Sequence, residues 1–242
     1  MKPKLVSALA ALAFICAASL AASPQIAASP AVRPGAPLPA SERFVFARTV
    51  GDKHDLVETR IRLVSEKGEN WYELTSHSTE QDLLLKLDPL TLLANYTEVT
   101  SRGKDATLRR VTTILENKSS VGPDEIILTG FESLPYTLRA FPWGLRQKAK
   151  ISFMGASGGG SFRFDIGVAG KETIAVGGQG IECWKAQLSL SGIMGTFFGK
   201  SYLWYSTAYP HYLVKSESAS AGPGSPTSVL TLVSYTASDK AD

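Results

Sequence analysis

The feature that most constrains the fold is a two-residue hydrophobic period, which recurs along most of the chain after residue 40. Its clearest example is the set Phe162, Phe164, Ile166 and Val168, which fall on one face of an extended chain. Side chains alternate between two faces only in a β-strand, so this period predicts strands. About twelve strand candidates follow one another, separated by turns rich in Gly, Asp and Asn. We therefore expect an all-β domain, an antiparallel meander that closes into a barrel or a half-open barrel.

Helical periodicity is nearly absent from the same region. Two segments favour a helix, residues 78–85 and residues 133–147. Pro135 and Pro142 interrupt the second segment, which limits it to a few turns. The fold is therefore expected to contain at most one or two short helices.

The N-terminus has the pattern of a secretory signal peptide. Lys2 and Lys4 precede an apolar run over residues 5–22, which ends in small residues. Cleavage near residue 22 would deliver a periplasmic or secreted protein. Two alternatives are a retained membrane anchor, since the run approaches the length of a short membrane span, and a lipid attached to Cys16. The residue before Cys16 is Ile15, whereas the bacterial lipid-attachment motif needs a small residue there.

The rest of the chain divides by composition. Residues 23–40 contain five prolines and many Ala and Ser residues, which predicts an extended tether. We expect a single β domain over residues 41–237 and a frayed tail over residues 238–242. If residues 1–22 are removed, Cys183 is the one remaining cysteine, and its place in an alternating segment beside Trp184 predicts that it is buried.

The charge balance limits the possible partners. The chain carries 25 basic and 22 acidic residues, a formal net charge of +3. This excess is too small to indicate binding to nucleic acid or to an anionic membrane surface. The three histidines do not lie at the spacings of a metal site, and we expect neither a metal nor a cofactor.

One motif resembles that of a catalytic serine. Residues 155–159 match G-x-S-x-G around Ser157, and Asp165 and His211 follow in the order that α/β-hydrolases use. That motif requires a helix after the serine, whereas three glycines and a strand pattern follow Ser157. We therefore interpret it as a hairpin loop, expect no catalytic residues, and keep a serine hydrolase as the least favoured alternative.

Aromatic residues are dense near the C-terminus. Five of them are candidate ligand-binding residues: Trp184, Tyr202, Trp204, Tyr205 and Tyr212. In a strand, Tyr202 and Trp204 share one face and Tyr205 lies on the other, so one set must be covered by a helix, a loop, a ligand or a partner. The aromatics either fill the interior of a barrel or line an open apolar mouth.

Four segments resemble an exported bacterial family, domain of unknown function 3108. They are residues 131–142, 174–186, 203–205 and 212–215. The similarity is clearest over the C-terminal half of the chain. It implies a periplasmic or surface-associated β-barrel without established catalytic residues.

Together these observations favour an exported, non-catalytic barrel that binds an apolar or amphipathic component of the cell envelope, such as a lipid. The alternative is an envelope scaffold that binds another protein through an exposed strand edge or through the tether.

Overall fold

The computed structural model describes residues 38–102, 108–111, 120–128, 130–154, 161–192, 199–219 and 226–240. Within these ranges the chain forms fourteen strands. They are β1 (Ser41–Val50), β2 (Lys53–Glu66), β3 (Glu69–His77), β4 (Gln81–Leu87), β5 (Ala94–Arg102), β6 (Leu108–Val111), β7 (Ser120–Val121), β8 (Glu125–Leu128), β9 (Lys148–Met154), β10 (Ser161–Val176), β11 (Gln179–Leu190), β12 (Ser201–Ser206), β13 (Leu213–Ala219) and β14 (Thr227–Ser238). The predicted signal peptide and nearly all of the predicted tether lie outside the described residues.

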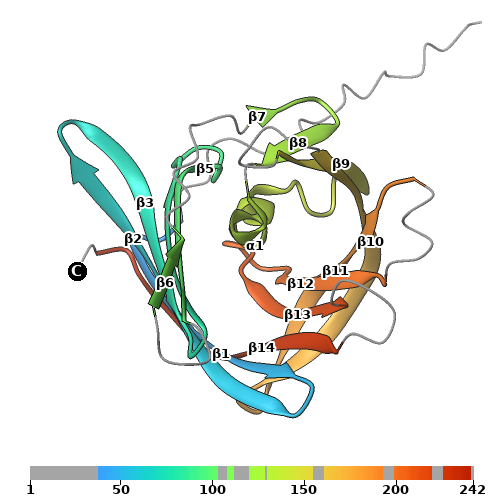
Figure 1. Cartoon of the computed structure of the whole chain (residues 1–242). Helices are drawn as coiled ribbons and strands as arrows, with labels where there is room; N and C mark the ends of the chain where they lie inside the picture. The colour runs from blue at the N-terminus through green and yellow to red at the C-terminus, as the bar shows by residue number, and fades with distance from the viewer. Residues whose placement is uncertain are drawn as a thin grey trace, which may run out of the picture.

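The strands form one sheet, in the order β6-β5-β4-β3-β2-β1-β14-β13-β12-β11-β10-β9-β8-β7. β1 pairs with β14, so strands from opposite ends of the chain lie together at the middle of the sheet. The sheet curls into a nearly closed barrel (Figure 1), and β6 and β7 are its two ends. The predicted all-β barrel is confirmed.

The alternating pattern produces the fold because one face of each strand points into the barrel. In β4, Leu83, Leu85 and Leu87 are buried, and the residues between them are partly exposed. The predicted helix over residues 78–85 is therefore wrong. Ser78 begins a turn instead: its hydroxyl donates to the carbonyl oxygen of Gln81 and accepts from the backbone N–H of Gln81. A side chain that bonds the backbone in this way favours a turn over a helix.

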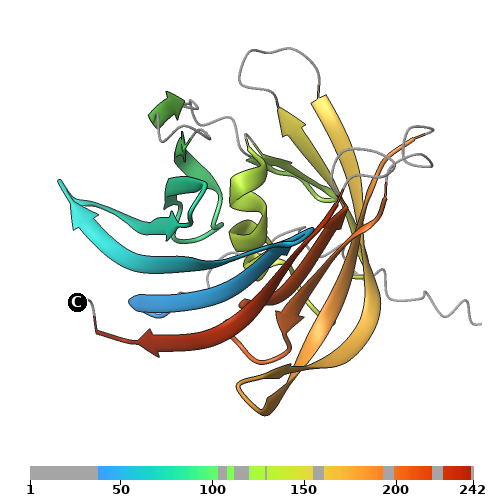
Figure 2. The same cartoon turned by 60° about the horizontal axis from the view of Figure 1, so that its bottom comes forward.

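One pairing departs from the predicted antiparallel meander. β8 and β9 run parallel, and a parallel connection needs a crossover rather than a hairpin. Residues 131–140 supply its helical part, as η1 (Phe131–Ser133), α1 (Leu134–Thr137) and η2 (Leu138–Ala140). This helical segment, called the plug below, lies inside the barrel (Figures 1 and 2). The helix predicted within residues 133–147 is thus present, and it ends before Pro142.

The plug is held to the barrel wall by hydrogen bonds that satisfy backbone carbonyls. The hydroxyl of Tyr205 on β12 donates to the carbonyl of Pro135 at 2.8 Å. The hydroxyl of Thr137 donates to the carbonyl of Leu92 at 2.8 Å. Tyr205 and Thr137 are fully buried, so each bond replaces solvation that the carbonyl has lost.

A buried ion pair fixes the C-terminal end of the plug. Two guanidinium nitrogens of Arg139 each lie 2.8 Å from a carboxylate oxygen of Glu42 on β1. The side chains are 2% and 0% exposed. The hydroxyl of Tyr235 on β14 also donates to Glu42, at 2.7 Å. The plug is therefore bonded to the two strands that join the ends of the chain.

Candidate functional site

Two of the predicted ligand-binding aromatics belong to the inner face of the sheet. Trp184 on β11 and Tyr205 on β12 are cross-strand partners, which places them on the same face. Tyr205 stacks on Trp143, with ring centroids 5.0 Å apart, and burial raises the pKa of its hydroxyl well above the usual value. The inner set is therefore packed against the plug and the loop that follows it.

Two others lie on the outer face. The ring of Trp204 is sandwiched between ammonium groups, with Lys185 and Lys215 at 5.1 and 4.9 Å from its centroid, and its indole N–H donates to Glu172. Tyr202 lies beside it, at a centroid distance of 6.0 Å. Trp204 is only 2% exposed although it faces outward. The long lysine side chains cover this indole.

The fifth aromatic, Tyr212, stacks on Tyr235 with ring centroids 4.2 Å apart and lies 6.2 Å from the ring of Phe44. The five candidates thus occupy both faces of the sheet and do not converge on one cavity among the described residues. Their role in ligand binding stays a prediction.

The hydrolase hypothesis needs three side chains to meet. Ser157 lies outside the described residues. Nδ1 of His211 donates to the backbone carbonyl of Ser206 at 3.0 Å, and Asp165 accepts a hydrogen bond from Ser191 at 2.7 Å. In a catalytic triad, Nδ1 of the histidine donates to the aspartate. Here Nδ1 of His211 donates to Ser206 and Asp165 accepts from Ser191, so the two side chains are bonded to other partners.

Cys183 is fully buried, as its alternating context predicts, and burial raises the pKa of its thiol to about 12. A thiol with such a pKa stays protonated at neutral pH and is a poor nucleophile. In the described part of the chain, no three His, Cys, Asp or Glu side chains gather closely enough to hold a metal ion. Nor does any helix there have the length and apolar character needed to cross a bilayer.

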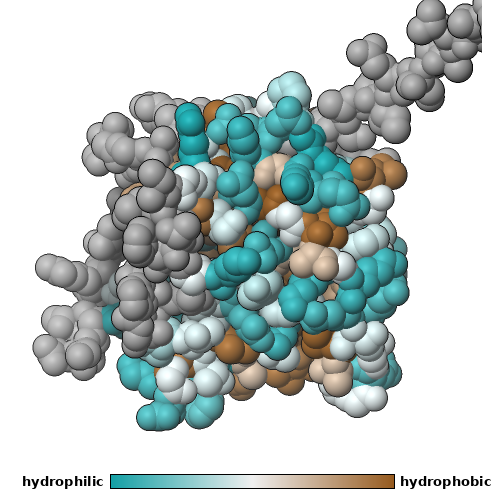
Figure 3. Space-filling view, turned by 90° about the vertical axis from the view of Figure 1, so that its right-hand side faces the viewer, coloured by the Kyte–Doolittle hydropathy of each residue, from teal (hydrophilic) through white to brown (hydrophobic). Residues whose placement is uncertain are grey.

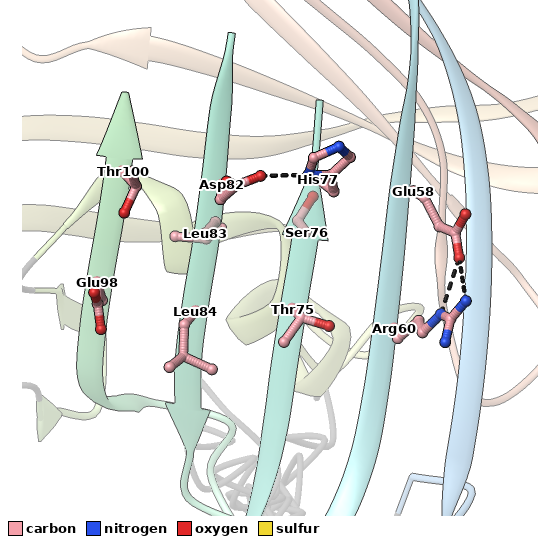
Figure 4. Close-up of a pocket in the computed structure, with 10 residues that line it drawn as sticks. All are labelled: Glu58, Arg60, Thr75, Ser76, His77, Asp82, Leu83, Leu84, Glu98 and Thr100. Atoms are coloured by element: carbon pink, nitrogen blue, oxygen red, sulfur yellow. Dashed lines mark hydrogen bonds and ion pairs between the residues drawn. The ribbon is translucent and has the colours of Figure 1, made fainter. Parts of the chain in front are cut away.

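A groove of about 590 Å³ lies on the outer face of β2 to β5 (Figure 4). Its walls include a hydrogen-bonded pair, His77 with Asp82, and an ion pair, Arg60 with Glu58. Burial alone would raise the pKa of Asp82, but hydrogen bonds from Arg102 and His77 lower it below its ordinary value. Charged and polar side chains from all four strands line this groove beside Leu83 and Leu84. The side of the molecule that bears β10 is likewise mostly hydrophilic, with scattered apolar areas (Figure 3).

A cavity of about 70 Å³ lies between the plug, β1 and β2 in the described part of the chain. Ligand pockets for small molecules usually measure roughly 300–1,000 Å³, so this cavity is too small to hold a lipid.

A second small opening with a mostly apolar lining lies at one end of the barrel and is called the end pocket here. It measures about 120 Å³ and is formed by the end of the plug with the loop after it, the β4–β5 turn, the β12–β13 loop and the first described residue. Its lining residues are Leu38, Leu90, Leu92, Arg139, Ala140, Phe141, Pro142, Trp143, Tyr209, Pro210 and His211.

Two polar groups meet the apolar wall of the end pocket. Arg139 is neutralised by Glu42, and its Nε lies 3.4 Å from the carbonyl of Pro210. Burial lowers the pKa of His211, so its imidazole is neutral at pH 7. Because Nδ1 donates to Ser206, Nε2 carries no hydrogen and is a hydrogen-bond acceptor. The pocket can therefore accept an apolar group that carries a hydrogen-bond donor.

Backbone conformation also singles out the end pocket. Leu92 and His211 have φ values of 56° and 53°, in the left-handed region that non-glycine residues rarely adopt. Residues held in such conformations often cluster at functional sites. The third residue of this kind, Lys67, belongs to a hairpin turn with Gly68, where the conformation is ordinary.

Sequence reasoning did not select this site. It considered His211 only as a structural or catalytic residue and gave Arg139 and Trp143 no functional role. It counted Tyr209 among the C-terminal aromatics but not among the five candidate ligand-binding residues. One sequence feature could have indicated the site: a proline lies next to aromatic residues in two loops, at residues 141–143 and 209–210.

Comparisons with known proteins give a fold-level likeness only. No protein-family model matches the chain, so the resemblance to domain of unknown function 3108 is not supported by one. No curated protein matches either.

Three solved structures are similar in outline. The hypothetical lipoprotein YmcC from Escherichia coli matches with a TM-score of 0.36 and 13% identity, over 84% of this chain and 89% of that one. A β-barrel-like protein of domain of unknown function 1849 from Brucella abortus matches with a TM-score of 0.44 and 7% identity, over 84% of this chain and 100% of that one. A protein of the DUF1329 family from Desulfovibrio piger matches with a TM-score of 0.30 and 10% identity, over 81% of this chain and 84% of that one. Likenesses at this level carry no information about function.

Proposed function

We propose that the protein is an exported envelope protein without catalytic activity, and that it binds an apolar or amphipathic envelope component, such as a lipid, at the end pocket. The observation that supports this most is the composition of the pocket. Leucine and aromatic side chains form its wall, and the neutral His211 and the Arg139–Glu42 pair supply polar contacts at one side. Ligand sites commonly combine an apolar wall with a few placed polar groups.

The volume of the pocket limits which part of a ligand it holds. About 120 Å³ corresponds to roughly four water molecules at liquid density. The pocket would thus hold one end of a ligand, and the rest would lie outside it against the surrounding loops.

The test is native mass spectrometry of the protein purified gently from the periplasm, followed by denaturing mass spectrometry. We expect extra mass that disappears on denaturation. Ala140→Leu should abolish it by filling the pocket, whereas Ala175→Leu, at an exposed position on β10, should leave it unchanged. A bare mass for the wild-type protein, or bound mass that survives Ala140→Leu, would count against the proposal.

A second candidate function is a scaffold that binds another envelope protein by strand addition. It is favoured by one observation, that the order of the described strands ends at β6 on one side and at β7 on the other. Sheet ends present unpaired backbone groups that a partner strand can use. Crosslinking in cells from residues on β6 should then recover a single protein partner, and recovery of none would exclude this role.

A further inference from the structure

Another groove lies on the outer face of β9, β10 and β11, on the hydrophilic side of the molecule that bears β10 (Figure 3), and measures about 500 Å³. Because Ala149 and Ile166 are buried in the barrel, their neighbours along the strands point outward. Two rows of cross-strand partners form the floor: Lys148, Gly167 and Gln187 in one, and Lys150, Asp165 and Ser189 in the other. We call this surface the β10 groove. Its volume is within the range of about 300–1,000 Å³ that small-molecule sites occupy.

Gly167 lies in the middle of the β10 groove and in the interior of its strand. Glycine weakens a strand, because it loses more conformational freedom on folding than other residues and has no side chain to pack. Its φ here is outside the left-handed region, and a Cβ added to it would meet nothing within 4 Å. The bulge that follows Val168 has its positive φ at Gly170 instead. A strand glycine that neither the backbone nor the packing requires is typical of a place where a ligand approaches the main chain closely.

The side chains around Gly167 offer both hydrogen-bond donors and acceptors. In the part of the chain that the structure describes, the ammonium groups of Lys148 and Lys150 have no ion-pair partner, so their N–H groups can bond a ligand. The Asp165 carboxylate accepts a hydrogen bond from Ser191 at 2.7 Å, and a carboxylate has the capacity to accept several. The amide of Gln187 adds a donor and an acceptor on the opposite side of Gly167.

The charges in and beside the β10 groove balance. They are three cations and three carboxylates: Arg146, Lys148, Lys150, Asp124, Asp165 and Glu125. Asp124 pairs with Arg146, and Glu125 stands opposite Lys150 on the parallel strand β8. The groove therefore has no net charge with which to attract an anion or a cation, and it suits a ligand that is itself uncharged.

The position of the groove within the sheet narrows the choice further. β10 is paired along the groove on both sides, with β9 and with β11. A peptide therefore cannot add to β10 as a strand, because the backbone groups that it would use are already bonded. An apolar ligand would displace water from the ammonium and carboxylate groups without replacing its hydrogen bonds. A sugar avoids both problems, because each hydroxyl both donates and accepts and because the C–H face of the ring can rest on a backbone without a side chain.

We propose that the β10 groove binds a neutral saccharide, with one sugar ring lying over Gly167. Hydroxyls of the ring accept hydrogen bonds from Lys148 and Lys150 and donate to Asp165. This inference goes beyond the proposed function, because the β10 groove is on the outer face of the barrel and shares no lining residue with the end pocket.

The test is binding of the purified protein to an array of neutral and acidic bacterial oligosaccharides, followed by NMR titration with the neutral oligosaccharide that binds most tightly. We expect at least one neutral oligosaccharide to bind. Its amide shifts should be confined to residues 146–150, 165–168 and 187–189. The affinity should be the same at low and at high salt, because an uncharged ligand forms no ion pair that salt can screen.

The decisive variant is Gly167→Val, which places a branched side chain where the ring lies. It should abolish binding, while its urea midpoint should equal or exceed that of the wild type, because valine is favoured in strands and the space is open. The matched control is Ala175→Val, which makes an exposed addition on β10 outside the groove and should keep the wild-type affinity. Lys148→Met should weaken binding roughly tenfold, as expected for the loss of a hydrogen bond from a charged group.

The inference is overturned if no neutral oligosaccharide binds, if only acidic ones bind and salt weakens them, or if binding survives Gly167→Val. A lower urea midpoint for Gly167→Val would show that the strand itself needs the glycine, and Lys148→Met then decides. Unchanged affinity in Lys148→Met would overturn the inference, and weaker binding by a folded Lys148→Met would uphold it.

Discussion

The ion pair between Arg139 and Glu42 gives the sharpest stability prediction. Replacing Arg139 with Met leaves the Glu42 carboxylate 0% exposed, with the Tyr235 hydroxyl as its remaining charge-stabilising contact. Removing one partner of a buried pair costs about 3–5 kcal/mol. For a urea m-value of about 2 kcal/mol/M, the unfolding midpoint should fall by about 1.5–2.5 M.

The double variant Glu42→Met with Arg139→Met should recover most of this loss, because it leaves no buried charge. The hydroxyl of Tyr235 then lacks its acceptor, so a deficit of about 1–2 kcal/mol should remain. The control is Arg43→Met, which breaks an ion pair with Glu58 on the outer face and should leave the midpoint unchanged, since exposed pairs contribute little. Urea titrations of the variants followed by tryptophan fluorescence measure all of these. A loss below about 1 kcal/mol for Arg139→Met, or a double variant no more stable than the single one, would refute the reasoning.

Three further predictions concern the plug and the core. Gly144→Ala should destabilise the fold by about 1–3 kcal/mol, because φ is +78° and the new Cβ would lie 3.2 Å from a ring carbon of Trp184; equal urea midpoints would contradict this. Tyr205→Phe should cost about 1–3 kcal/mol and speed hydrogen exchange in the plug, since it leaves the Pro135 carbonyl without its donor; unchanged exchange would show that another contact holds the plug. Burial raises the pKa of Cys183 to about 12, whereas a thiol in the unfolded chain has a pKa of about 8.5. The contribution of Cys183 to the free energy of unfolding is therefore fully present below about pH 8.5 and falls as the pH rises toward 12. Urea titrations at several pH values should show a smaller fall for Cys183→Ala, and an equal fall would contradict this.

The sequence predicted which face of a strand is buried wherever that depends only on the neighbouring residues in the same strand. In β10, Phe164, Ile166 and Val168 are more buried than the exposed Arg163 and Asp165 between them, as the alternating pattern predicts without reference to any other part of the chain. The same rule misled at residues 78–85, where apolar spacing also fits a helix and the turn made by Ser78 decides the outcome.

The candidate site was harder to predict because its contacts are long-range. Arg139 and Glu42 are 97 positions apart, and no local sequence pattern around either residue indicates that they form a pair. The outward Trp204 was identified as needing a cover, but nothing in the strand pattern shows that Lys185 and Lys215 provide it. Trp204 and Tyr205 are consecutive and both buried because each face of β12 is covered, by the two lysines outside and by Trp143 inside.

The pairing of β1 with β14 has a consequence for how the protein is made. Ser41 lies opposite Ser238, so the first strand obtains one of its two neighbours only when nearly the whole chain is present. A chain that emerges N-terminus first, from a ribosome or through a membrane channel, must keep one side of β1 unpaired until then. Such long-range pairing slows folding and exposes strand edges to other chains. The growing polypeptide therefore needs protection from aggregation for longer than one built from local hairpins alone, and loss of its last dozen residues would leave that edge open for good.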